Sequence, residues 1–189
     1  MPDRVRLPVR VLFVGINPGI RSAETGHHFA GYSNRFWKLL HESGMVTEPI
    51  GSQDDARLAE WGYGITNLVP RATPGIDTLT PDEYVAGLRV LRGKIRRWKP
   101  EVVALVGVTL HRAIFGKAGA TPFRVGCQAE GFEGAQLFVL PNPSGRNANY
   151  SYAEMLAAFR ALAAFLSIAT QAGTPATTRT RRRPSERRR

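Results

Sequence analysis

Val9-Arg10-Val11-Leu12-Phe13-Val14-Gly15-Ile16-Asn17-Pro18-Gly19 joins a strand pattern directly to a turn pattern. The apolar run from Val11 to Val14 predicts a short buried strand, and the Gly and Pro residues around Asn17 predict a sharp turn at its carboxyl end. In open α/β sheets, ligands bind in the crevice outside the carboxyl ends of the strands. We therefore expect Asn17 to face a binding site.

The rest of the chain alternates strand and helix patterns. Capping boxes at Thr80 and Ser151 predict the starts of two long helices, which end near Trp98 and Ile168. This alternation predicts a mostly parallel sheet covered on both faces, that is, a three-layer α/β/α single domain. Further strands are expected over residues 65–69, 102–106 and 137–140, further helices over 34–44 and 109–115, and a loop over 15–31.

Composition indicates a basic protein with a polyanionic partner. The chain has 189 residues, a net charge of +11 and a sequence pI of about 10.8. We expect residues 1–173 to form the domain and residues 174–189, with seven Arg and one Glu, to be a disordered basic tail. Such a tail either adds to nucleic-acid binding or mainly solubilises the protein.

Cysteine and hydropathy patterns exclude several classes of protein. The single cysteine, Cys127, excludes an internal disulfide and a cysteine-built zinc or iron–sulfur site, and we expect it to pack as a small hydrophobe. No run of about 18 apolar residues is present, and residues 1–10 are too charged for a secretory signal. We expect a cytoplasmic monomer, nucleoid-associated if bacterial, with no membrane, metal or cofactor.

A second turn-rich loop, Pro141-Asn142-Pro143-Ser144-Gly145, follows the last predicted strand. In a single parallel sheet, this loop and the loop at Asn17 are expected to converge on one crevice. A neutral amide in that crevice is no general base of any strength, so Asn17 can hold a water molecule or bind a base edge. Neither loop contains a lysine that could form a Schiff base.

These motifs together resemble the mismatch-specific uracil/thymine DNA glycosylases, family 2 of the uracil-DNA glycosylase superfamily. The resemblance extends from Val9 to Leu166 and implies a uracil-DNA-glycosylase-like fold. It also implies a monofunctional enzyme of base excision repair that flips and hydrolytically removes uracil, or thymine or ethenocytosine, mispaired with guanine in double-stranded DNA. The motifs that carry it are 15–19, Asn34-Arg35-Phe36-Trp37, Thr66-Asn67-Leu68-Val69, Arg71-Ala72-Thr73-Pro74-Gly75 and Asn142-Pro143-Ser144.

The resemblance also implies roles for individual residues. Asn17 would hold the attacking water, and Phe29 would stack on the flipped base. His28 could donate a hydrogen bond to the leaving base, because its ring titrates near neutrality. Arg146 would fill the space of the flipped base or contact the widowed guanine. The base pocket would comprise Ile16, Ile20, Ser22, Phe29, Asn67 and Asn142, with Ser144 and Gly145 bringing the late loop close to DNA.

Each role has a simpler alternative. Asn17 can be a turn former, Phe29 a core aromatic and His28 a polar surface residue. Glu24, the single carboxylate of the first loop, can assist the water instead of Asn17. The whole chain can also be a non-catalytic protein that binds nucleic acid or a nucleotide in the same crevice. Independently of that alternative, Asn142 can cap its own loop and Arg146 can contact phosphate.

Overall fold

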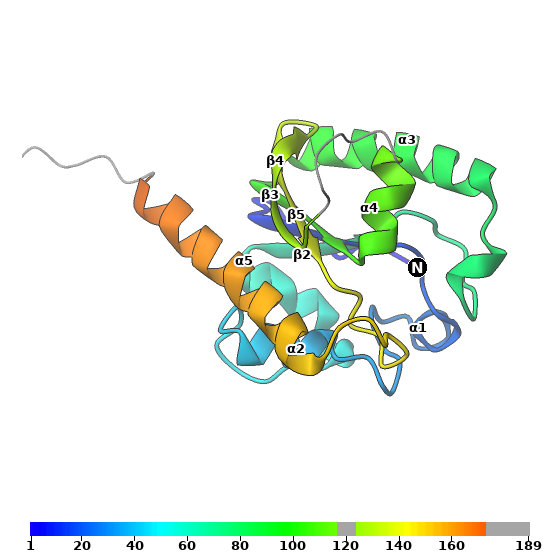
Figure 1. The fold of residues 1–189 in the computed structure, drawn as a ribbon, viewed down its shortest axis with the longest axis horizontal. Coiled ribbons are helices and arrows are strands. Elements are labelled where there is room, and N and C mark those ends of the chain that lie inside the picture. The colour runs from blue at the N-terminus through cyan, green and yellow to red at the C-terminus, as the bar shows by residue number, and fades with distance from the viewer. Residues whose placement is uncertain (117–123, 173–189) are drawn as a thin grey trace, which may run out of the picture.

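A computed structural model describes residues 1–116 and 124–172, and the predicted basic tail, 174–189, lies outside the described residues. The described chain contains one five-stranded sheet in the order β2-β1-β3-β5-β4 (Figure 1). Neighbouring strands are parallel except for β4, which pairs antiparallel with β5. The strands are β1 (Val11–Gly15), β2 (Tyr63–Asn67), β3 (Val102–Val106), β4 (Gly126–Phe132) and β5 (Ala135–Leu140).

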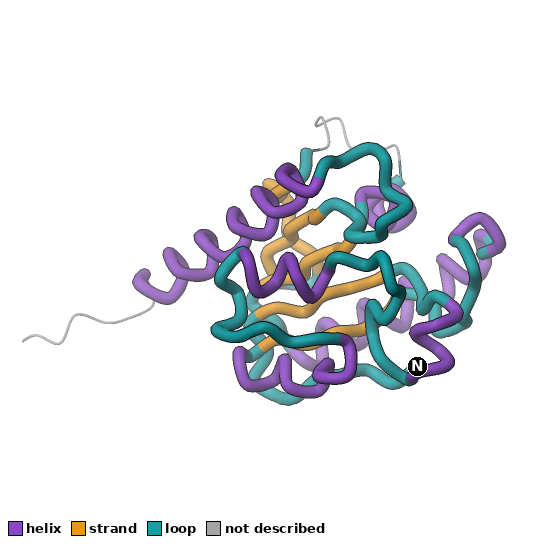
Figure 2. Tube along the Cα trace, turned by 90° about the horizontal axis from the view of Figure 1, so that it is seen from below, coloured by secondary structure: helices purple, strands orange, loops and turns teal. Residues whose placement is uncertain are grey.

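Helices cover both faces of this sheet, so the expected three-layer α/β/α architecture is confirmed. Figures 1 and 2 show α3 and α4 on one side of the strands and α2 and α5 on the other. The α-helices are α1 (Ile20–Thr25), α2 (Phe36–Glu42), α3 (Pro81–Trp98), α4 (Val108–Phe115) and α5 (Tyr152–Ala172), and the 3₁₀ helices are η1 (Ser52–Trp61) and η2 (Ile76–Thr78).

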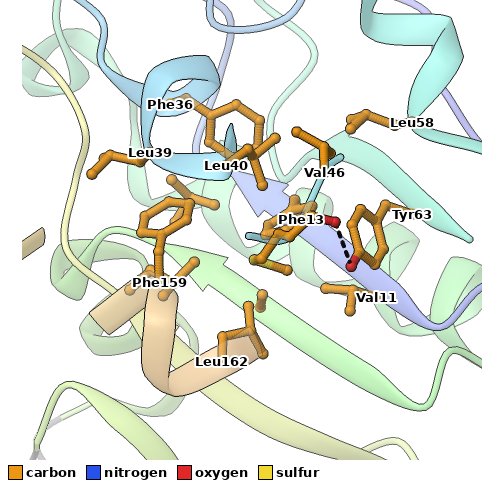
Figure 3. Close-up of a cluster of buried hydrophobic side chains, with 14 of the residues drawn as sticks. Val11, Phe13, Phe36, Leu39, Leu40, Val46, Leu58, Tyr63, Phe159 and Leu162 are labelled. Carbon is orange, nitrogen blue, oxygen red and sulfur yellow. Dashed lines mark hydrogen bonds between the residues drawn. The ribbon is translucent and has the colours of Figure 1, made fainter. Parts of the chain in front are cut away.

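Side chains alternate across β1 and divide the core into two halves. Val11 and Phe13 face the α2, η1 and α5 side, whereas Leu12 and Val14 face α3 and α4. Every residue of β1 is buried, as expected for a strand of a parallel sheet covered on both faces. Figure 3 shows the first half, in which Phe13 packs edge-on against Phe36 with ring centroids 5.2 Å apart.

Several local features differ from the sequence-based expectations. The predicted loop 15–31 contains the short helix α1, and the region between α2 and β2 contains η1. The strand β4 was not predicted, because it is an exposed edge strand without a continuous apolar run. Cys127 was expected to be packed away from solvent, but it is exposed because it lies on this edge strand.

Two glycines of α3 are expected to respond oppositely to alanine. A Cβ at Gly87 would lie 2.4 Å from the Leu68 carbonyl oxygen, whereas a Cβ at Gly93 would meet no atom within 4 Å. Gly87→Ala should therefore push α3 from the sheet and cost about 1–3 kcal/mol of unfolding free energy. Gly93→Ala should stabilise the helix by about 0.5–1 kcal/mol. Urea unfolding of the two variants checks this, and equal effects would contradict it.

Candidate active site

A cavity of about 730 Å³ lies where the loops following β1, β2 and β5 meet. It is lined by the first loop, by Asn67 at the end of β2, by Pro74 and by Asn142 and Arg146 of the late loop. The expected convergence of the two motif loops is therefore confirmed. The volume falls within the range of small-ligand sites and is large enough to admit a pyrimidine.

The side-chain amide of Asn17 is held in one orientation at this cavity. Its Nδ2 donates to Thr73 Oγ1 at 2.6 Å, to the Arg71 carbonyl at 3.1 Å and to the Pro18 carbonyl at 3.2 Å. Because carbonyl oxygens only accept, these contacts assign nitrogen to the Nδ2 position and leave Oδ1 as the acceptor of the amide. Asn17 is thus more than a turn former, since its side chain joins two loops.

Thr73 is the main support of that amide and is 3% exposed. Its hydroxyl donates to the Gly75 carbonyl at 2.5 Å while it accepts from Asn17, and its backbone N–H donates to the Pro18 carbonyl at 3.1 Å. The sequence motif 71–75 was noted, but no role was predicted for Thr73. An isolated threonine gives no signal of this kind, because the contact joins residues 56 positions apart.

The segment 71–75 is in turn attached to the start of α3. The Arg71 guanidinium donates to Glu83 Oε1 at 2.6 Å and to Glu83 Oε2 at 2.9 Å. This ion pair, together with the capping contact to the Thr80 backbone N–H, lowers the pKa of Glu83 to about 2. Arg71 is therefore engaged within the protein, and its carbonyl is well placed to hold the Asn17 amide.

Phe29 lines the cavity and also packs on the core. Its ring stacks on Phe36 with centroids 4.1 Å apart and an interplanar angle of 24°. A Cβ at Gly15 would lie 2.6 Å from Asn67 Oδ1, so a larger residue there would displace the Asn67 side chain, whereas its 3.6 Å distance to Phe29 Cζ is an ordinary contact. Phe29 has φ of 52°, a left-handed conformation that costs about 1–3 kcal/mol in a non-glycine residue.

Ser22 and His28 lie beside Phe29, and both are buried. Ser22 Oγ accepts from the Ala30 backbone N–H at 3.0 Å, and the Trp37 indole donates to the His28 carbonyl at 3.2 Å. His28 Nε2 lies 2.9 Å from the Pro2 carbonyl, which can only accept, so Nε2 carries the ring hydrogen. His28 is therefore a buried residue of the cavity wall and not a polar surface residue.

Burial lowers the pKa of His28, and this shift predicts a pH dependence of stability. The unfolded chain binds a proton near pH 6.5 while the folded chain resists it, so stability should fall as the pH drops below about 6.5. We expect wild type to lose more unfolding free energy between pH 7.5 and pH 5.5 than His28→Gln. Urea unfolding at the two pH values measures this difference. Equal losses in both proteins would contradict it.

The late loop reaches across the mouth of the cavity. The Arg146 guanidinium donates to the Pro74 carbonyl at 3.4 Å, which joins this loop to segment 71–75. Asn142 Oδ1 accepts from the Ser144 backbone N–H at 3.0 Å, so Asn142 does cap its own loop, although it also lines the cavity. Gly145 does not line the cavity, because it packs against Ser33, where a Cβ would lie 2.5 Å from that residue's Cβ.

The remaining predicted residues line the cavity in different environments. Ile16 is buried, whereas Ile20 is 44% exposed at the start of α1. Glu24 lies on the same wall and is exposed. Arg21 and Tyr32, which were not predicted as site residues, form part of the rim, and the Arg21 guanidinium lies 3.7 Å from the Tyr32 ring centroid. No local pattern in the sequence indicates this pair, because the two residues are eleven positions apart.

Within residues 1–116 and 124–172, no group of three or more His, Cys, Asp or Glu side chains is arranged to hold a metal ion. None of the helices in these ranges is both long and apolar enough to cross a bilayer.

The chain is an α/β protein with a cavity at the carboxyl ends of a mostly parallel sheet, which is where folds of this class bind their ligands. The family model of the uracil DNA glycosylase superfamily matches residues 2–165, so the chain belongs to this superfamily, whose members hydrolyse the bond between base and sugar in DNA. The solution NMR structure of a proposed uracil DNA glycosylase from Methanosarcina acetivorans shares the fold with a TM-score of 0.58. The two sequences are 16% identical over 86% of this chain and 96% of that chain.

Proposed function

We propose that this protein is a monofunctional DNA glycosylase of the mismatch-specific uracil/thymine type. Its substrates are uracil, and thymine or ethenocytosine, mispaired with guanine in double-stranded DNA. The target nucleotide leaves the helix and enters the cavity at Asn17, at a cost that is smallest for weak pairs such as G·U and G·T. The protein acts as a monomer, and the basic tail adds to its affinity for DNA.

The observation that carries this proposal is the orientation of the Asn17 amide. With Nδ2 held by Thr73, Arg71 and Pro18, Oδ1 is the atom that can accept a hydrogen bond from a water molecule in the cavity. An amide oxygen orients this water without deprotonating it strongly. Bond breaking must then depend on stabilising the departing base as an anion and the sugar as an oxocarbenium-like cation.

The other predicted residues receive roles consistent with their positions. Phe29 stacks on the flipped base, and Ile16, Ile20, Ser22, Asn67 and Asn142 surround it. The backbone N–H groups of Ile16 and Ile20 are our candidates for donors to the base oxygens. His28 can donate to the leaving base only by exchanging the Pro2 carbonyl for a base oxygen, because Nε2 carries its one ring hydrogen.

Arg146 must change partners when DNA binds. In this structure the Arg146 guanidinium contacts the Pro74 carbonyl across the mouth of the cavity at 3.4 Å, and this long hydrogen bond is weak. In the proposal Arg146 leaves Pro74 and enters the space of the flipped base, where it can bind the widowed guanine. Ser144 and Gly145 bring this loop to the DNA backbone, and the packing of Gly145 on Ser33 fixes its position.

Single-turnover base release from labelled duplexes tests the proposed function. Uracil, thymine and ethenocytosine opposite guanine, and uracil opposite adenine, are incubated with the protein and then treated with alkali. We expect abasic sites from the guanine mispairs, fastest for G·U, and no strand cleavage before alkali. Glu24→Gln should retain the wild-type rate, whereas a large loss would assign the water to Glu24. DNA binding without any base release would establish the non-catalytic binder instead.

A further inference from the structure

Asp55 is a buried carboxylate that the proposed chemistry does not use. It lies in η1, outside both motif loops, and is 1% exposed. A carboxylate is rarely buried to this extent unless it is paired and hydrogen-bonded, because losing its hydration is costly. The contacts of the Asp55 carboxylate therefore indicate which neighbouring segments it stabilises.

Both carboxylate oxygens of Asp55 accept hydrogen bonds, one from the segment that ends at Phe29 and the other from Arg4. Oδ2 accepts from the His28 backbone N–H at 3.1 Å, and Oδ1 accepts from the Arg4 guanidinium at 2.9 Å. The His27 ring Nδ1 lies 3.3 Å from Oδ1 but outside hydrogen-bonding alignment. Asp55 thus fixes the backbone of the residue directly before Phe29.

Arg4 is itself anchored on the sheet. Its backbone pairs with Ile65 of β2 through hydrogen bonds of 2.9 and 2.8 Å, and its guanidinium also donates to the Gly26 carbonyl at 3.0 Å. Arg4 therefore connects Gly26 directly to the edge strand β2, and it connects His28 to the same strand through Asp55. The Arg4 guanidinium also supplies the positive charge that the buried Asp55 carboxylate requires.

Phe29 needs such support because its backbone conformation is unfavourable. Its φ of 52° places the ring on the cavity wall, and the residues on both sides are fixed by side chains: His28 by Asp55 and Ala30 by Ser22. Without one of these anchors, the segment can relax to an ordinary conformation and carry the ring out of position.

We propose that Asp55, with Arg4 as its counter-charge, is a positioning residue that holds Phe29 in the orientation needed to stack on the flipped base. This inference rests on the proposed glycosylase function. It assigns a role in base placement to a residue of η1, which is distant in sequence from both motif loops. The effect of Asp55 on excision must then be exerted through Phe29.

Asp55→Asn tests the role, with Asp54→Asn as the matched control on the same helix. Asparagine keeps the size of the side chain but replaces one carboxylate oxygen with an NH2 group. This donor then faces either the Arg4 guanidinium or the His28 backbone N–H, and it can accept a hydrogen bond from neither. We expect Asp55→Asn to lower the single-turnover rate on G·U duplex about 10- to 100-fold and to leave the Kd for undamaged duplex unchanged. Asp54→Asn, whose carboxylate caps only the Gly51 N–H, should excise at the wild-type rate.

A double variant separates positioning from general destabilisation. If Asp55 acts through Phe29, Asp55→Asn in a Phe29→Ala background should slow excision by less than about twofold more, because contacts in one network are not additive. The inference would be overturned if the rate losses of Asp55→Asn and Phe29→Ala multiplied in the double variant, or if Asp55→Asn alone excised at the wild-type rate. Should Asp55→Asn fail to fold, Arg4→Gln, which removes the counter-charge of Asp55, replaces it in the same cycle. A wild-type protein that releases no base would overturn the proposed function and this inference together.

Discussion

Asn17→Ala is expected to lower the single-turnover rate of uracil release from a G·U duplex at least about 100-fold. The variant removes the oxygen that orients water, while the cavity and the loops around it remain. Loss of the amide also leaves Thr73 Oγ1 without its donor, but Thr73 keeps its hydrogen bond to Gly75. The fold should therefore persist, and the Kd for the duplex should change by less than about threefold.

The measurement is a rapid-quench time course with protein in excess, together with a binding titration by fluorescence anisotropy. Glu24→Gln is the matched control, since Glu24 lines the same cavity and offers the alternative acceptor. A wild-type rate for Asn17→Ala would remove the central element of the proposed mechanism. A parallel loss of rate and DNA affinity would instead point to a role in building the loop.

Thr73→Val is expected to give the second large effect, a loss of about 10- to 100-fold in the same rate. Valine matches threonine in shape but offers no acceptor to Asn17 Nδ2 and no donor to the Gly75 carbonyl. The Asn17 amide then keeps only the longer contacts to Arg71 and Pro18, and Oδ1 is held less firmly. The buried unpaired groups should also cost about 1–3 kcal/mol of unfolding free energy.

Thr73→Ser is the matched control because it restores the hydroxyl without the methyl group. We expect it to recover most of the excision rate while retaining a small loss of stability from the missing methyl. Urea unfolding and single-turnover kinetics of the two variants separate the contributions. If Thr73→Ser is as slow as Thr73→Val, packing of the methyl group matters more than the hydroxyl, and Thr73 does not act through Asn17.

The sequence-based prediction succeeded where a pattern is local. β3 begins and ends as expected, and the capping box at Thr80 starts α3, in which the Thr80 hydroxyl accepts from the Glu83 N–H. β4 was missed because an exposed edge strand buries little apolar surface and so carries no apolar run. The helix α1 was missed because it spans six residues within a segment dominated by turn-forming residues.

In the candidate site, too, some residues could be predicted from local sequence patterns and others could not. The motif residues Asn17 and Asn142 could be named from the chain alone, because strand ends with Gly and Pro turns place them at one edge of a parallel sheet. The hydrogen-bonding partners of these two motifs could not be named from the sequence. Thr73 and Asp55 carry no local signal, since each acts on a residue far away in the sequence.

Local sequence patterns thus predicted the layered α/β class, the edge of the sheet at which the candidate site lies and the neutral amide of Asn17 at that edge. These features follow from periodicity and turn chemistry, which involve residues close together in the chain. Packing between distant segments established the rest: which atom of the Asn17 amide is available, which side chains bind the residues on both sides of Phe29, and which tautomer His28 adopts. Orientation of a side chain depends on partners that only folding brings within hydrogen-bonding distance.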